Sequence, residues 1–364
     1  MKIKDIITLL EQIAPLSLQE SYDNAGLLIG NAGNECSGVL ITLDVTEEVM
    51  KEAIIKKTNL IISHHPLIFG GLKKITGTTA TERITMQAIK NDIAVYAIHT
   101  NLDNIIGGVN AMICQKIGLT KLKPLAPGQK QLRKLITYCP VDYAEKVRVA
   151  LFEAGAGQIG NYDSCSFNSD GTGTFKAGAG SNPFVGKQNE LHREPETRIE
   201  TIFPFFLENK IINALLASHP YEEVAYDIYQ LENKNLQTGS GMKGILEQSL
   251  SPAAFLQLLK DRFETGSIRY SEFTDKPIKT VAVCGGAGSF LINKALSAGV
   301  DAFITGDIKY HDFFIPEGRM LLADIGHYES EQFTKELLFK QITKIFPTFA
   351  VLISEHNTNS VHYF

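Results

Sequence analysis

The sequence predicts an α/β protein in which two segments of alternating strands and helices flank an insert of a different pattern. Short apolar runs alternate with amphipathic stretches in residues 1–127 and again in residues 241–364. Between them, residues 128–240 follow a strand–helix–strand–strand–helix–strand order, which is typical of a ferredoxin-like split βαβ unit. We therefore expect a discontinuous α/β domain that is interrupted by a smaller α+β domain.

The first flanking segment begins with an amphipathic helix over residues 2–14, which Pro15 ends. A polar turn, YDNAG (22–26), leads into a short apolar strand, and composition alone favours a plain turn here. The remaining elements are strands over 38–43, 59–62 and 93–98, helices over 46–57, 81–90 and 108–118, and a loop over 69–79. The β-α-β order from residue 38 to residue 62 implies a parallel pair of strands.

The insert and the second flanking segment are assigned in the same way. In the insert we expect strands over 132–139, 198–206 and 224–231, helices over 141–154 and 211–217, and short strand-like pieces within the Gly-, Ser- and Asn-rich stretch 155–195. The sequence QTGSG (237–241) is interpreted as a linker. Beyond it we expect a helix over 252–263, strands over 278–284, 301–304, 319–323 and 349–353, a helix ending near 298, and a long helix over 329–345.

Composition excludes several classes of protein. The 364 residues are 44% hydrophobic and 21% charged, with a net charge of -5 and no Lys/Arg run, which disfavours a nucleic-acid partner. No apolar stretch of about 20 residues could span a bilayer, and the amino terminus lacks the apolar core of a signal peptide. Five scattered cysteines without a CxxC motif fit neither a disulfide framework nor a zinc knuckle, so we expect a reducing cytoplasm.

Two adjacent histidines, His64 and His65, end the strand over 59–62 and are followed by Pro66. Successive strand residues point to opposite faces, so the two imidazoles should diverge and suit two separate metal ions. In open α/β sheets, ligand sites gather at the carboxyl ends of the strands. The alternative is one surface histidine and one packed histidine.

Three further pairs of potential ligands follow predicted strands at a spacing of four residues: His99 with Asp103, Asp307 with His311, and His327 with Glu331. Side chains at this spacing share one face of a helix and can share a metal ion. Each pair alone could be an ordinary polar pair. Four pairs at the strand ends of one α/β sheet favour a two-metal site instead, and the mixture of histidines and carboxylates suits zinc, manganese or iron better than calcium.

The other candidate motifs give weaker evidence for a functional site. The glycine run 285–289 is either an anion cradle or a tight packing turn, since it lacks the spacing of a dinucleotide motif and the lysine of a P-loop. There is no GxSxG nucleophile elbow. The remaining histidines at 192, 356 and 362 have no partner nearby in the sequence.

Four motifs in combination resemble the Nif-three-like family of dinuclear metal-binding proteins, also called GTP cyclohydrolase I type 2 homologues. These are SHHPLIF (63–69), HTNLD (99–103), TGDIKYHD (305–312) and GHYESE (326–331). The stretch YDNAGLLIG (22–30) is similar to that family's N-terminal motif, so it is more than a plain turn. The insert, with SHPYEEVAYDIY (218–229), looks like the PII/CutA-like domain of the longer bacterial members.

The resemblance implies an αβα scaffold and metal ligands at His64, His65, Asp103, His327 and Glu331, with Glu331 bridging two ions. His99, Asp307 and His311 match further motif positions, and we place them as groups that orient the ligands or carry protons. The family also implies a hexameric ring with its metal sites facing an internal cavity.

We therefore predict a cytoplasmic metal-dependent hydrolase that uses two divalent ions, zinc foremost and manganese or iron as alternatives, on a nucleotide or a related small molecule. Asp307 or His311 would pass protons. The competing interpretation is a non-catalytic regulatory or assembly protein that binds metal and works through its insert. Because histidine binds metal only when neutral, metal affinity should weaken as the pH falls through roughly 6.

Overall fold

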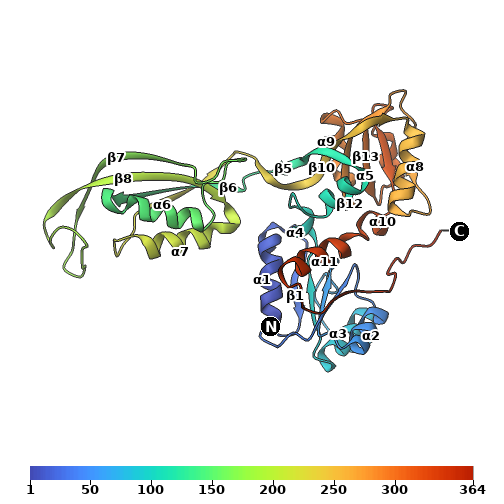
Figure 1. Ribbon diagram of the computed structural model, residues 1–364, viewed down its shortest axis with the longest axis horizontal. Coiled ribbons are helices and arrows are strands. Elements are labelled where there is room, and N and C mark those ends of the chain that lie inside the picture. The colour runs from blue at the N-terminus through green and yellow to red at the C-terminus, as the bar shows by residue number, and fades with distance from the viewer. Residues whose placement is uncertain (364) are drawn as a thin grey trace. The chain divides into compact units, whose positions relative to one another are not determined.

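The computed structural model describes residues 1–363, and the chain forms two compact units (Figure 1). The first, which we call the flanking unit, consists of Met1–Ala126 and the chain from Gln237 onward. The second, which we call the insert, consists of Pro127–Leu236. None of the described helices is both long and apolar enough to cross a membrane.

The flanking unit contains a first sheet of five strands. In spatial order these are β1 (Gly26–Ile29), β4 (Ala94–Ala97), β3 (Leu60–Ser63), β2 (Val39–Thr42) and β15 (Val351–Ile353). All neighbours are parallel except β1, which runs antiparallel to β4. The parallel pairing of β2 with β3 confirms the predicted β-α-β unit.

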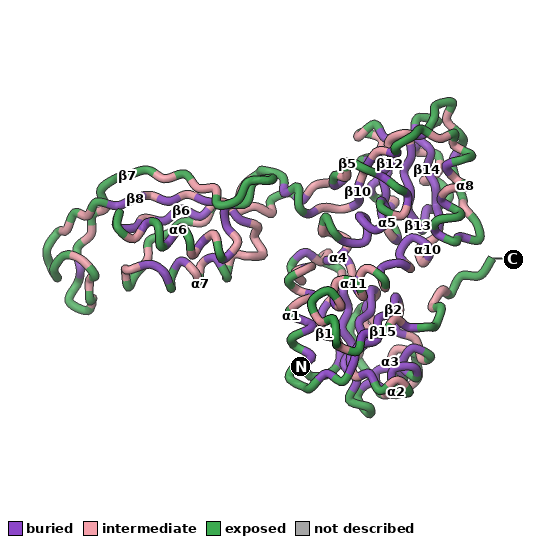
Figure 2. The backbone as a smooth tube through the Cα atoms, viewed as in Figure 1, coloured by how far each residue is buried: buried purple, intermediate pink, exposed green. Residues whose placement is uncertain are grey.

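Helices cover both faces of this sheet, because its central strands are apolar on both sides. The helices are α1 (Ile3–Ile13), α2 (Glu47–Lys56), α3 (Ala80–Lys90) and α11 (Thr334–Ile345). Leu40 and Ile61 pack against α2 and α3, whereas Ile41 and Ile62, one residue further along, belong to the core that includes α1 and α11. The central strands β2, β3 and β4 are accordingly buried at every residue, and this part of the tube is largely purple in Figure 2.

The same unit contains a second sheet of six strands. In spatial order these are β11 (Arg269–Tyr270), β14 (Leu321–Asp324), β13 (Ala302–Gly306), β12 (Ile278–Ala287), β10 (Asn235–Leu250) and β5 (Leu119–Gly128). The helices associated with it are α5 (Val109–Ile117), α8 (Pro252–Phe263) and α9 (Ile292–Ser297). Strands β12, β13 and β14 are parallel, so their carboxyl ends lie at one edge. Our expectation of a single sheet behind all the strand-end pairs is therefore wrong.

The prediction of a linker over 237–241 is also wrong, because these residues lie within β10. Strand β5 was not predicted from the sequence. Composition misled us here, since glycines in QTGSG and beyond serve close packing rather than flexibility. A Cβ on Gly244 would lie 2.9 Å from the Cβ of Leu119, and a Cβ on Gly241 would lie 2.9 Å from the carbonyl oxygen of Val283.

The insert is a four-stranded antiparallel sheet with two helices on one face. Its strands, in spatial order, are β7 (Ser166–Lys176), β8 (Leu191–Pro204), β6 (Leu132–Pro140) and β9 (Tyr226–Leu231). The helices are α6 (Ala144–Glu153) and α7 (Glu208–Ser218), which pack through Val147, Leu151, Ile211 and Leu215. The observed β-α-β-β-α-β order is the one expected from the sequence.

Two details of the predicted elements need correction. Residues 155–195 hold a long hairpin of β7 and β8 rather than short pieces, and its polar, glycine-rich β7 is largely exposed (Figure 2). The long helix expected over 329–345 is broken at residues 332–333 into α10 (His327–Glu331) and α11. Short 3-10 helices lie at Leu16–Leu18, Val141–Tyr143, Phe205–Leu207, Ser289–Leu291 and Tyr310–Phe314.

Candidate metal centre

Side chains from both sheets of the flanking unit meet at the carboxyl ends of parallel strands. His64 and His65 follow β3, and Asp103 ends the short helix α4 (Thr100–Asp103) after β4. His327 and Glu331 are the first and last residues of α10, which follows β14 of the second sheet. The central residues of parallel strands are buried and apolar, whereas the loops at their carboxyl ends lie at one edge of the sheet. Polar ligand residues therefore gather on these loops.

Glu331 is the centre of the cluster, and its two oxygens face different groups. Oε1 lies 3.7 Å from His64 Nε2, which is also 3.7 Å from Asp103 Oδ1. Oε2 lies 3.0 Å from His65 Nε2 and 3.2 Å from His327 Nε2. The buried Glu331 carboxylate therefore joins two sets of three potential ligands, one on each side.

Each imidazole is oriented by an acceptor on its other nitrogen. Nδ1 of His64 lies 2.9 Å from the carbonyl oxygen of Ile98, and Nδ1 of His65 lies 2.7 Å from Asp44 Oδ1. Nδ1 of His327 lies 2.7 Å from Asp307 Oδ2. Since these oxygens accept, each Nδ1 donates its hydrogen, and each Nε2 faces the cluster, where it offers a lone pair when the ring is neutral.

The arrangement leaves polar atoms that the described protein groups do not satisfy. His64 Nε2 and Asp103 Oδ1 are buried and find no hydrogen-bond partner in residues 1–363. Nε2 of His65 lies 3.3 Å from Nε2 of His327, so the two nitrogens face each other. Two ligands about 2.1 Å from a tetrahedral zinc ion lie roughly 3.4 Å apart, close to the separations in this cluster. The residues present thus fit bound metal ions.

The pKa shifts of the histidines and carboxylates show that the cluster favours bound positive charge. Burial disfavours the imidazolium of His65, but hydrogen bonds with Asp44 and Glu331 outweigh burial and raise its pKa to about 10. The pKa of His327 rises to about 9 for the same reason, through Glu331 and Asp307. Burial raises the pKa of Asp103 to about 7 against the opposing effect of His64, and the neighbouring Glu331 adds to the rise.

The glycine run 285–289 is a packing turn and not an anion cradle. The amide of Gly285 donates to Asn110 Oδ1, that of Gly286 to Ser330 Oγ, and that of Gly288 to Thr305 Oγ1. Gly286 has φ +58°, and a Cβ there would lie 2.5 Å from Glu331 Oε1. Glycine is thus needed to bring the backbone against the Glu331 carboxylate.

The three remaining predicted site residues lie in different places. His99 lies beside the cluster, with ring centroids 5.3 Å from His64 and 5.4 Å from His65. Asp307 orients His327 from a left-handed conformation with φ +55°, a backbone strain that is typical of functional positions. His311 lies outside these ligand sets, exposed on the 3-10 helix 310–314, where its ring contacts Tyr310 and Phe314.

Sequence reasoning missed two carboxylates. Asp44, which orients His65, directly follows the predicted strand 38–43, so an acidic residue at a strand end was an available signal. Asp23, in the YDNAG turn, accepts from Nδ1 of His99 at 2.7 Å and from the backbone amide of Thr100 at 3.0 Å. These hydrogen bonds outweigh burial and hold the pKa of Asp23 at about 2.

Two cavities adjoin the cluster. One of about 380 Å³ is lined by His99, Asp103 and Glu331, and the exposed rings of Tyr22, Phe69 and Phe290 also line it. The other, of about 600 Å³, is lined by His65 and His327 together with Arg269 and the chain's last described residues. The cluster is therefore open to small molecules on two sides.

Comparisons with known proteins identify the family. The sequence model of Duf34/NIF3 (NGG1p interacting factor 3) matches residues 1–360. The "GTP cyclohydrolase 1 type 2 homolog" of Bacillus subtilis (strain 168) is 41% identical over 347 residues, which are 94% of this chain and 92% of that protein. The protein of the same name from Halalkalibacterium halodurans is 41% identical over 345 residues, 93% of this chain and 92% of that protein.

Solved structures agree with this assignment. A Bacillus cereus protein related to NIF3 superposes with a TM-score of 0.87 at 38% identity, covering 100% of this chain and 99% of that one. The Staphylococcus aureus protein SA1388 superposes with a TM-score of 0.78 at 32% identity, with the same coverage. The resemblance drawn from the four motifs is confirmed, and the chain belongs to the DUF34/NIF3 family.

Proposed function

We propose that this protein is a two-metal hydrolase that acts on a nucleotide or a related small molecule. The observation that carries the proposal is the position of Glu331, whose two oxygens face two separate sets of ligands. A shared carboxylate is the usual way to hold two divalent ions close together, and such a pair suits hydrolysis.

The geometry supports two ligand sets. His64, Asp103 and Glu331 would hold one ion, and His65, His327 and Glu331 would hold the other. Three protein ligands to each ion leave positions for water or substrate, as catalytic sites require. Zinc suits these ligands best, with manganese and iron as alternatives. When bound, the ions would supply Lewis-acid activation of water and substrate.

The chain's own residues would position the substrate and handle protons. Tyr22, Phe69 and Phe290 present exposed rings around the smaller cavity, where a planar base could stack. His99 lines that cavity and has its Nδ1 held by Asp23, which leaves Nε2 to exchange a proton. We therefore assign proton transfer to His99 in preference to His311, which lies outside the ligand sets. We assign Asp307 the orientation of His327.

The names of the relatives are consistent with a purine nucleotide as substrate, since several are called "GTP cyclohydrolase 1 type 2 homolog". The test is a screen of GTP, other nucleotides and phosphoesters with protein loaded separately with zinc, manganese or iron. We expect turnover of at least one compound, its loss in Glu331→Gln, and its retention in Asp275→Asn, which changes an exposed residue. Absence of turnover with all three metals would contradict the proposal.

We also propose that the chain assembles into a hexameric ring in the cytoplasm, as the family resemblance implies. Light scattering on the purified protein should give the mass of six chains. A monomeric mass would contradict this part of the proposal.

A further inference from the structure

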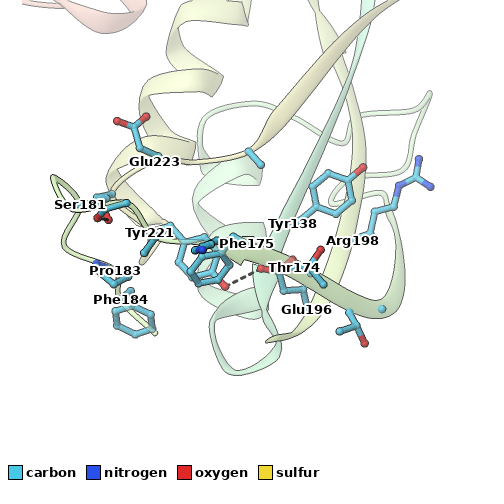
Figure 3. Close-up of a pocket in the computed structure, with 18 of the residues that line it drawn as sticks. Tyr138, Thr174, Phe175, Ser181, Pro183, Phe184, Glu196, Arg198, Tyr221 and Glu223 are labelled. Carbon is cyan, nitrogen blue, oxygen red and sulfur yellow. Dashed lines mark hydrogen bonds between the residues drawn. The ribbon is translucent and has the colours of Figure 1, made fainter. Parts of the chain in front are cut away.

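The insert has a cavity of its own. It has a volume of about 650 Å³, and all the residues that line it belong to the insert. The curled β7–β8 hairpin and the loop after α7 form its walls, and the rings of Phe175, Phe184 and Tyr221 come together there (Figure 3). The ring centroid of Tyr221 lies 6.2 Å from that of Phe175 and 6.3 Å from that of Phe184. This size and this lining are typical of a small-molecule site.

A buried carboxylate, Glu196, lines the same cavity and is only 9% exposed. The Tyr221 hydroxyl donates to its Oε1 at 2.7 Å (Figure 3). Among the described residues no lysine, arginine or histidine forms an ion pair with it, and the nearby Arg198 pairs with Glu200 at 2.7 Å instead. Glu196 is therefore a buried acid without a basic partner, which is rare in proteins.

The neighbouring histidine does not supply the missing charge. Nε2 of His219 donates to the carbonyl oxygen of Tyr138 at 2.9 Å, and Nδ1 accepts from the backbone amide of Tyr221 at 3.1 Å. A ring that accepts on one nitrogen and donates on the other is neutral. Burial also lowers the pKa of His219.

Several contacts within the insert fix the shape of this cavity. A Cβ on Gly173 would lie 2.1 Å from Glu196 Oε2, so only glycine leaves room for the carboxylate there. The loop between β7 and β8 is tied back, because the backbone amide of Asn182 donates to Glu222 Oε1 at 2.8 Å. Phe184, on the same loop, contacts the ring of Tyr143 at a centroid distance of 5.3 Å. The rings are thus held around the carboxylate by contacts on several sides.

We propose that this cavity binds a small organic cation, an ammonium or a guanidinium, with its charge on Glu196 and its body against Phe175, Phe184 and Tyr221. A cation would pair the buried carboxylate, whose one hydrogen-bond partner among the described residues is the Tyr221 hydroxyl. The faces of aromatic rings carry negative charge and favour the same kind of ligand. This site is independent of the proposed metal centre, which lies in the other unit.

The test compares phenethylammonium with phenethyl alcohol, which has the same ring and chain length without the charge. Calorimetric titration of the full-length protein should show tighter binding of the ammonium by about tenfold or more. In Glu196→Gln, which retains an acceptor for the Tyr221 hydroxyl, this preference should disappear. Equal binding of the two compounds by the wild type, or no binding of either, would overturn the proposal.

Three further variants locate the site. Glu153→Gln changes an exposed carboxylate of the insert that does not line the cavity, and it should leave the affinity within about twofold. Phe184→Leu should weaken the ammonium by about fivefold, and this variant decides the matter if Glu196→Gln does not fold. Glu331→Gln should bind the ammonium as the wild type does. Loss of binding in Glu331→Gln with retention in Glu196→Gln would place the cation at the metal centre and overturn the proposal.

Discussion

The two units of this protein each bury a glutamate, but they surround it differently. Glu331 in the flanking unit faces three imidazoles, each of which points its Nε2 toward the carboxylate. Glu196 in the insert faces a tyrosine hydroxyl and aromatic ring faces. Because burial of an unpaired anion is costly in free energy, we expect each carboxylate to bind a cation.

The difference between the two sites lies in the kind of cation that each can take. Nitrogen lone pairs and carboxylate oxygens form directed bonds to a metal ion, so the cluster around Glu331 is selective for small divalent ions. Ring faces attract a larger, weakly hydrated cation without forming such bonds. A buried glutamate can therefore bind either a metal ion or an organic cation, and the neighbouring atoms determine which of the two it binds.

Removal of metal should have the largest effect, and it should destabilise the flanking unit alone. Two ions that bind only the folded flanking unit would stabilise it by about 4 kcal/mol each when free metal is 1,000 times Kd. We expect a chelator to lower the melting transition of the flanking unit in a calorimeter and to leave that of the insert in place. A shift of both transitions together, or of neither, would contradict the assignment of metal to the flanking unit.

Loss of an orienting carboxylate should weaken metal binding without removing a ligand. In Asp44→Asn and Asp307→Asn, we expect metal affinity to fall about 10- to 100-fold, because His65 and His327 lose the acceptors that fix their tautomers. Competition against a chromophoric chelator measures the change. Asp275→Asn is the matched control in an exposed position, and an effect in the two test variants no larger than in this control would count against the orienting role.

The pH dependence sharpens the description of the metal centre. The raised pKa values, about 10 for His65 and about 9 for His327, mean that protons compete with metal for these imidazoles at pH 7. Metal must displace these protons, so affinity should rise with pH up to about 10, well above the window near 6 that unperturbed histidines predict. Calorimetry at pH 7 in buffers of different ionisation enthalpy should reveal proton release, and its absence would contradict these assignments.

The same shifts fix the sign of a stability effect in metal-free protein. A raised histidine pKa stabilises the folded state fully below pH 6.5, and this stabilisation is lost as the pH rises through about 10. The lowered pKa of Asp23 acts in the opposite range, with stability present above pH 3.8 and lost as the pH falls through about 2. Urea unfolding across pH measures both limits.

The smallest effect concerns the insert alone. Glu196→Gln removes a buried charge and keeps an acceptor for Tyr221, so the free energy of unfolding should change by about 1 kcal/mol or less, in the stabilising direction. Urea unfolding of the ligand-free protein measures it. A loss of more than about 2 kcal/mol in the free energy of unfolding would show that Glu196 stabilises the fold, and it would count against a role in ligand binding.

The parts that could be predicted from the sequence depend on neighbours along the chain. The buried runs that became β2 and β3 are short and apolar, and the helix between them has a helical period, so their order implied a parallel pair. Likewise, a spacing of four residues was enough to place His327 and Glu331 on one face of a helix.

The parts that could not be predicted depend on distant segments. Strand β15, at the end of the chain, pairs with β2, and no local pattern indicates that partner. The existence of two sheets, and the meeting of His65 with Glu331 across 266 residues, is likewise a property of the tertiary structure. Glycines near residue 241 suggested a linker, because composition does not tell close packing from flexibility.

Metal content per chain shows whether this chain holds two metal ions on a shared carboxylate. Elemental analysis should compare the reconstituted wild type with His65→Ala and Glu331→Ala. We predict about two ions per chain in the wild type and a sharp fall in both variants. No metal in the wild type after reconstitution, or two ions retained in both variants, would contradict the account.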